Sequence, residues 1–142
     1  MASLERFASS AQRAVRLRGE IAILITSSAS IRLLNRDFRG KDKPTDVLSF
    51  PSAAKGLAGD IAISAQIANK QAKALGHTLA TELKVLILHG MIHLAGHDHE
   101  SDDGEMAALE AKLRAKLKLP QGLIERTTSM AKKKSASRRS AR

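Results

Sequence analysis

The amino-acid sequence predicts a single α+β domain, and three observations lead to this prediction. The chain has 142 residues, of which 43% are hydrophobic, enough for one core and too little for two. Short apolar, β-branched runs alternate with longer amphipathic stretches. A nearly continuous apolar stretch from Thr78 to His89 indicates a helix that is buried on all sides. We therefore expect a small mixed sheet packed against about five helices, formed by residues 1–126.

Three strands are expected in the first half of the chain. Each is a short apolar run bounded by residues that favour turns, and the runs are Ile21–Ile25, Val47–Phe50, which Pro51 stops, and Gly59–Ile63. The segment between the last two strands, residues 52–57, is expected to be a hairpin connection. Residues 39–46 are rich in charged residues, Gly and Pro, and are expected to form a loop.

Helices are predicted from the spacing of apolar residues and from their capping residues. They are an amphipathic helix within residues 4–18, one capped by Ser30, one from Ser64 to Gly76, the buried helix that begins at Thr78, and a last helix before Pro120. Asp102 and Glu105 have the spacing of a capping box for the last helix. No apolar run has membrane-spanning length and the start lacks a secretory signal, so we expect a cytoplasmic protein without membrane contact.

Charge is distributed unevenly along the chain. The net charge is +10, and the segment 127–142 contributes six Lys and Arg residues and no acid. This segment is predicted to be a disordered basic tail, which can attach to polyanions by counterion release or simply aid solubility. Cysteine is absent, so any metal site must use histidine and oxygen ligands.

Four of the five histidines lie within residues 89–99. His89 and His93 are four apart, so on a helix their side chains share a face and can bind one ion. Gly96 favours a left-handed turn that ends the helix, after which His97 or His99 can approach the same ion. We prefer His99 as third ligand, which predicts one zinc per chain at the C-terminal end of the buried helix. A buried polar network is the alternative.

Three protein ligands leave an open position on a tetrahedral zinc, which is typical of a catalytic site. The spacing H-x3-H-x5-H matches that of metzincin proteases, but Gly90 replaces the glutamate that acts as their general base. Peptide hydrolysis is therefore disfavoured. His97 is expected near the metal or the substrate, and Asp98 is expected either to support a ligand histidine or to transfer a proton. His97, water activated by the metal and, were the substrate RNA, its 2′-hydroxyl remain alternatives as the base.

A second group of candidate residues lies in the loop after the second helix. Arg36, Arg39, Lys41 and Lys43 can contact phosphates, and Arg39, beside Gly40, is the best candidate to stabilise charge on a reacting phosphodiester. Taken alone, these charges also fit an ordinary solvated loop.

Together, the two groups resemble the YbeY family of zinc-dependent endoribonucleases. The resemblance rests on L-N-x-x-F-R-G-K-D-x-P-T-D-V-L-S-F-P at Leu34–Pro51, on G-D-I at Gly59–Ile61, and on H-G-x-x-H-x-x-G-x-D-H at His89–His99. It covers about residues 21 to 118 and implies an α+β metallohydrolase with zinc on His89, His93 and His99 and a functional Arg39. Members commonly have Tyr where this chain has His97, and they usually begin with an additional strand before the first helix.

The resemblance implies a single-strand-specific endoribonuclease of ribosomal RNA maturation, acting on the 3′ end of small-subunit rRNA, and of ribosome quality control. Aromatic residues make up 2% of the chain, so sequence readout by base stacking is weak and specificity must come from the ribosomal particle or a partner. A small-subunit ribosomal protein and an Era-type GTPase are candidate partners. Two alternatives are a non-catalytic zinc-containing factor for ribosome assembly and RNA binding, and a metallohydrolase of another substrate.

Overall fold

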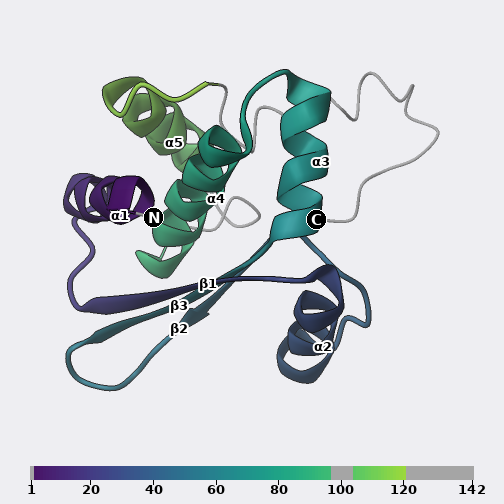
Figure 1. Ribbon diagram of the computed structural model, residues 1–142. Coiled ribbons are helices and arrows are strands. Elements are labelled where there is room, and N and C mark those ends of the chain that lie inside the picture. Colours follow the sequence, from purple (N-terminus) through teal and green to yellow (C-terminus); the bar gives the residue numbers. More distant parts are fainter. Residues whose placement is uncertain (1, 97–103, 121–142) are drawn as a thin grey trace.

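The structure is a computed structural model that describes residues 2–96 and 104–120. The elements in these ranges are α1 (Ala2–Val15), β1 (Glu20–Thr26), α2 (Ser28–Arg39), β2 (Val47–Pro51), β3 (Leu57–Ser64), α3 (Ala65–Leu75), α4 (Leu79–Leu94) and α5 (Glu105–Lys116) (Figure 1). The predicted α+β class, with five helices against a small mixed sheet, is confirmed. The predicted tail and the last residues of the predicted domain lie outside the described residues.

The sheet has the order β1-β3-β2 within the described residues. β3 is its central strand, parallel to β1 and antiparallel to β2. Ile61 of β3 is opposite Ile23 on one side and Ser49 on the other. The expected hairpin joins β2 to β3, and Pro51 forms the last position of β2, opposite Gly59. A proline is tolerated there because β2 lies at an edge of the sheet.

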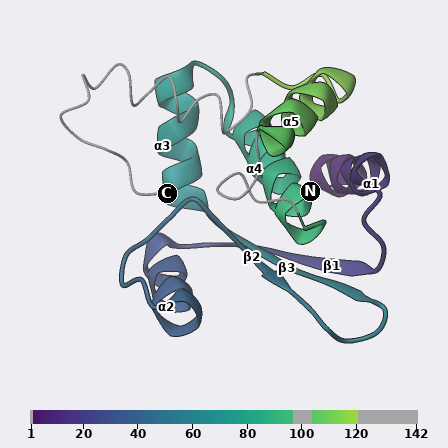
Figure 2. The same cartoon turned by 180° about the vertical axis from the view of Figure 1, so that it is seen from behind.

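Alternating residues of β3 divide the interior into two parts. Ile61 and Ile63 belong to the main core, to which α1, α4 and α5 contribute, whereas Ala62 belongs to a smaller core with Ile31 and Leu48. α2 therefore covers one face of the sheet, and α4 lies on the other face between α1 and α3 (Figures 1 and 2).

α4 is the central helix of the main core. Val85 to Ile92 are all buried, and Leu86 and Ile92 are fully excluded from solvent. Burying a side chain of this size contributes about 1.5–3 kcal/mol, so α4 is firmly held at the middle of the domain. The N-cap Thr78 and the buried apolar run confirm the sequence prediction for this helix. Neither α4 nor any other helix of residues 2–96 and 104–120 is both long and apolar enough to cross a lipid bilayer.

Two predicted helix starts are wrong. The N-cap of α2 is Ser27, whose Oγ accepts a hydrogen bond from the backbone N–H of Ser30 at 3.1 Å, so Ser30 lies inside the first turn. Ser27 can take this role because the strand before it ends at Thr26. The expected capping box of α5 does not form, because Gly104 is the N-cap and Glu105 is the first helical residue. Asp102 itself lies outside the described residues.

Candidate metal centre and basic loop

His89 and His93 lie side by side near the C-terminal end of α4. Their Nε2 atoms are 3.1 Å apart, and the rings meet edge to face with centroids 4.7 Å apart. His89 is 7% exposed, and His93 is half-buried. Two nitrogens bound tetrahedrally to one zinc at about 2.0–2.1 Å would be about 3.3 Å apart. The observed distance is that of a hydrogen bond between the two rings and is also close to the spacing of two zinc ligands, so the pair could hold an ion. The predicted sharing of one helix face is confirmed.

Glu110 of α5 contacts the other ring nitrogen of His89. Its Oε1 lies 3.0 Å from Nδ1 of His89, and the carboxylate is almost fully buried, with 2% of the residue exposed. A carboxylate can only accept at this distance, so the proton of a neutral His89 is held on Nδ1 and the lone pair on Nε2. That is the tautomer a metal ligand requires, and carboxylate support of this kind also raises ligand basicity.

The sequence analysis missed Glu110, although the sequence contains a signal for it. Glu110 follows Met106 by four residues and precedes Leu113 by three, so it lies on the apolar stripe of α5. An acid on the buried face of a helix needs a partner, because an unpaired buried carboxylate is costly. Only the packing of α5 on α4 shows that this partner is His89.

His99, the third predicted ligand, lies outside the described residues, and so do His97 and Asp98. What the structure describes is the end of the helix: α4 stops at Leu94, and Gly96 has a positive φ of 101° while its N–H donates to the carbonyl of His93. The prediction that Gly96 marks the helix end is thus confirmed. The choice of His99 over His97 stays a prediction, and residues 2–96 and 104–120 contain no group of three metal-ligating side chains.

Gly90, which stands where metzincin proteases have their catalytic glutamate, lies close to the sheet. A Cβ atom at this position would lie 3.0 Å from Cγ2 of Ile61 and 3.2 Å from Oγ of Ser49. Ser49 also donates a hydrogen bond from Oγ to the carbonyl of Gly90 at 3.2 Å. Position 90 therefore faces the sheet at close approach, where even a methyl group requires its neighbours to shift. A glutamate here would displace Ile61 and Ser49 and would start on the side of α4 that faces the sheet.

The predicted basic loop follows α2 and leads into β2. Gly40 ends α2 in a left-handed conformation, with a φ of 72°. Asn35, which is 1% exposed, stabilises the next turn with two hydrogen bonds. Its side-chain NH2 group donates to the backbone carbonyl of Lys43 at 2.8 Å, and its backbone carbonyl accepts from the backbone N–H of Lys41. The loop is therefore tied to a buried side chain of α2, while Arg39, Lys41 and Lys43 remain exposed and Asp46 is buried, with 2% of it exposed.

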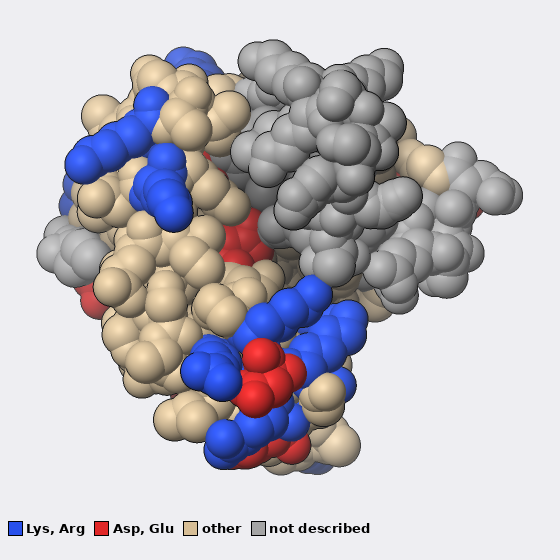
Figure 3. Space-filling model, turned by 90° about the vertical axis from the view of Figure 1, so that its right-hand side faces the viewer, with Lys and Arg blue, Asp and Glu red and all other residues tan. Residues whose placement is uncertain are grey.

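Two acids neutralise part of the positive charge in this region. Arg32 binds Asp42 through two hydrogen bonds of 2.7 and 3.3 Å, and Arg36 binds Asp37 at 3.0 Å. The hydrogen bond from Arg32 holds the pKa of Asp42 below its usual range, and the same bond raises the pKa of Arg32. Figure 3 shows this surface, where Lys and Arg gather around acidic side chains.

Three cations of the region are left without an acidic partner among the described residues, namely Arg39, Lys41 and Lys43. Arg36, also a candidate phosphate contact, differs from them because Asp37 compensates its charge. Arg39 forms no side-chain hydrogen bond and no ion pair within the described ranges. Arg39, Lys41 and Lys43 are thus the cations of this region whose charge is left available for an anionic ligand within the described residues.

The family model described as endoribonuclease YbeY matches residues 2–118. The chain belongs to the YbeY family. An endoribonuclease YbeY from Koribacter versatilis is 61% identical over 131 residues, which are 92% of this chain and 86% of that protein. One from Solibacter usitatus is 55% identical, covering 89% of this chain and 86% of the relative. A solution structure from Thermotoga maritima shares 32% identity and a TM-score of 0.58, with 80% of each chain covered.

Membership of the YbeY family confirms the resemblance drawn from the motifs, and the Thermotoga maritima structure confirms the fold class. The matched range includes both groups of candidate residues, the pair on α4 and the loop after α2. The geometry adds what the motifs lacked, namely the buried carboxylate beside His89 and the ion pairs of Asp42 with Arg32 and of Asp37 with Arg36.

Proposed function

We propose that this chain is a zinc-dependent endoribonuclease that cuts single-stranded RNA. One observation carries the proposal: in a chain of the YbeY family, two imidazole Nε2 atoms face each other at 3.1 Å and a buried carboxylate fixes the tautomer of one of them. A pair of this kind is suited to an ion, and the chain has no cysteine that could complete a structural thiolate site. We assign His89, His93 and, outside the described residues, His99 as the ligands of one zinc.

The residues divide the chemistry between them. When bound, a zinc ion supplies a Lewis acid that polarises a phosphoryl oxygen and makes water more acidic. Glu110 keeps the proton of His89 on Nδ1 and so keeps Nε2 available as a ligand. Arg39 donates to the phosphoryl oxygens as negative charge develops on them, and Lys41 and Lys43 hold neighbouring phosphates. His97 and Asp98 are the candidates for proton transfer close to the reacting bond.

The substrate that fits best is ribosomal RNA within ribosomal particles. The chain carries a net charge of +10 and only 2% aromatic residues, so it is suited to a polyanion but poorly equipped to select bases by stacking. Selection of a cleavage site, such as the 3′ end of small-subunit rRNA, is therefore assigned to the particle and to partners, for which a small-subunit ribosomal protein and an Era-type GTPase are our candidates. With this role in rRNA processing and ribosome biogenesis, we propose a cytoplasmic location.

The test compares the metal-replete chain with His93→Ala and Arg39→Ala on labelled single-stranded RNA, duplex RNA and a peptide library. The proposal expects cuts in single-stranded RNA by the wild type, none by His93→Ala, and slow cleavage by Arg39→Ala. RNA that is bound but never cut would overturn the proposal in favour of a non-catalytic assembly factor. Hydrolysis of peptides with indifference to Arg39 would overturn it in favour of another metallohydrolase.

A further inference from the structure

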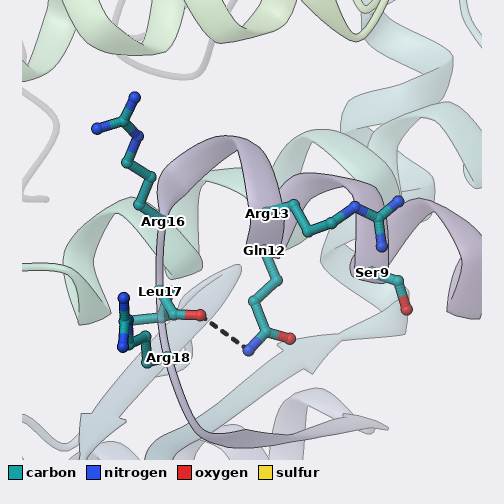
Figure 4. Close-up of a pocket in the computed structure, with 6 residues that line it drawn as sticks. All are labelled: Ser9, Gln12, Arg13, Arg16, Leu17 and Arg18. Atoms are coloured by element: carbon teal, nitrogen blue, oxygen red, sulfur yellow. Dashed lines mark hydrogen bonds between the residues drawn. The ribbon is translucent and has the colours of Figure 1, made fainter.

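The arginines at the C-terminal end of α1 are not part of the metal centre or of the basic loop. Arg13, Arg16 and Arg18 line a hollow of about 440 Å³, together with Ser9, Gln12 and Leu17 (Figure 4). All three arginines are exposed, and none forms an ion pair with an acid in the part of the chain that the structure describes. The hollow therefore concentrates positive charge that the fold itself does not neutralise.

Arg16 occupies a backbone position that an arginine rarely takes. Its φ is 64°, in the left-handed region, and the turn after α1 has the hydrogen bonds of a Schellman motif: Leu17 N–H donates to the carbonyl of Gln12, and Arg16 N–H to that of Arg13. Glycine is the usual residue here, since a side chain with a Cβ is strained at positive φ. The helix dipole favours a cation in the last turn, which accounts for Arg13 but not for Arg16 or Arg18, beyond the helix.

Gln12 makes the hollow a rigid structure. Its side-chain Nε2 donates to the carbonyls of Leu17 at 2.9 Å and Gly19 at 2.7 Å, so one amide fixes the turn that carries Arg16 and Arg18. Leu17 also packs against the main core from within this turn. The turn is thus held at both ends, and its arginine side chains project from an ordered backbone.

The directions of the side chains indicate the kind of anion. In Figure 4 the guanidinium groups of Arg13, Arg16 and Arg18 point away from one another rather than toward a common centre. Divergent cations do not enclose one small anion, but they can contact successive phosphates of an extended strand. The hollow begins where β1 begins, whereas the basic loop lies beyond α2, which starts at the other end of β1. The seven residues of β1 span about 23 Å.

We propose that the hollow at the end of α1 is a second RNA site, which binds the phosphodiester backbone of a single strand away from the metal centre. This second site rests on the proposed function, because RNA is its expected ligand, but its role is to bind RNA and not to cleave it. α1 and α2 lie on opposite sides of the molecule in both views, so an RNA that reaches both the hollow and the basic loop must be long (Figures 1 and 2). Short RNA can use only one of the two.

The test uses the full chain and two variants of equal charge. Arg16→Gly/Arg18→Gln removes two cations from the hollow and places glycine at the positive φ, so folding is not impaired. Arg6→Gln/Lys112→Gln removes two exposed cations of α1 and α5 that do not line the hollow. Fluorescence anisotropy measures the affinity of each protein for labelled oligouridines of about 4 and about 16 nucleotides at several salt concentrations.

The hollow variant is expected to bind the long RNA roughly tenfold more weakly and to show a salt slope shallower by about 1.4, because two phosphate contacts are lost. The control variant should lose less than half as much, and binding of the short RNA should change little. Equal losses in both variants, or an unchanged slope in the hollow variant, would overturn the proposal. Cleavage of the short RNA, followed on gels, tests the proposed function separately, because the hollow variant should cut it at the wild-type rate.

Discussion

Replacing Glu110 should weaken zinc binding without unfolding the protein. The carboxylate makes one hydrogen bond to Nδ1 of His89, at 3.0 Å, in a place where Glu110 is 2% and His89 7% exposed. Loss of such a carboxylate behind a ligand histidine typically costs 10- to 100-fold in metal affinity, or about 1.4–2.7 kcal/mol. Glu110→Gln keeps an acceptor but not the charge, so we expect a loss near tenfold. Glu110→Ala leaves the Nδ1 proton without a partner, and we expect a loss near 100-fold.

The assay is a competition between each protein and a fluorescent zinc chelator at fixed pH, with unfolding in urea measured on the same samples. His77→Gln is the matched control, because it replaces the imidazole of a second Glu–His contact, a part-buried one in which Nε2 of His77 lies 2.7 Å from Oε1 of Glu82. That contact involves neither α5 nor the histidine pair. Wild-type zinc affinity in both Glu110 variants would refute the reasoning, as would an equal loss in His77→Gln, which would show a general effect of fold stability.

Four further results are expected. Gly90→Ala should destabilise the fold by about 1–3 kcal/mol in urea unfolding, since its methyl group meets Ile61; unchanged stability would mean that the sheet yields freely. Arg39→Ala should raise the activation free energy of single-turnover RNA cleavage by about 2–4 kcal/mol with zinc content intact, and Arg39→Lys should not restore the full rate. A wild-type rate in Arg39→Ala would show that Arg39 is only a surface charge without a catalytic role. Asp42→Asn should tighten RNA binding, because it removes the negative charge that pairs with Arg32. Since the pKa of Asp42 is lowered, the ion pair should persist at neutral pH and be lost only as the pH falls through that lowered pKa, which an NMR titration of the carboxyl group measures. Removing residues 127–142 should flatten the salt dependence of RNA binding while cleavage at saturating RNA persists.

The sequence was sufficient for α4 because local signals and tertiary needs agree there. Thr78 caps the first turn, an apolar run fills the helix, and Gly96 turns the chain away after it, so the helix and the histidine pair could be placed before the structure was known. The strands were predicted for a similar reason, since each is a short apolar run between turn residues. The start of α2 has no unique local signal, because Ser27, Ser28 and Ser30 can each cap a helix, and the end of β1 at Thr26 makes Ser27 the N-cap.

The features of the site that the sequence did not predict depend on contacts between distant segments. Glu110 is 21 residues from His89 in sequence, and only the packing of α5 against α4 brings the two together. The division of charge in the basic loop also has no local pattern, because Arg32 and Asp42 are ten residues apart and meet across the end of α2. The sequence shows which charges are present in the loop, whereas the structure shows which of them have acidic partners.

The central claim is that zinc at the His89–His93 pair is required for RNA cleavage. The most direct measurement is a titration of the metal-depleted full chain with zinc, in which single-turnover cleavage of a single-stranded RNA is followed against bound zinc per chain. We predict a rate that is negligible at zero zinc, rises in proportion to occupancy and reaches a plateau at one zinc per chain. Cleavage that proceeds at the full rate in the depleted chain, or that does not change as zinc binds, would contradict the account.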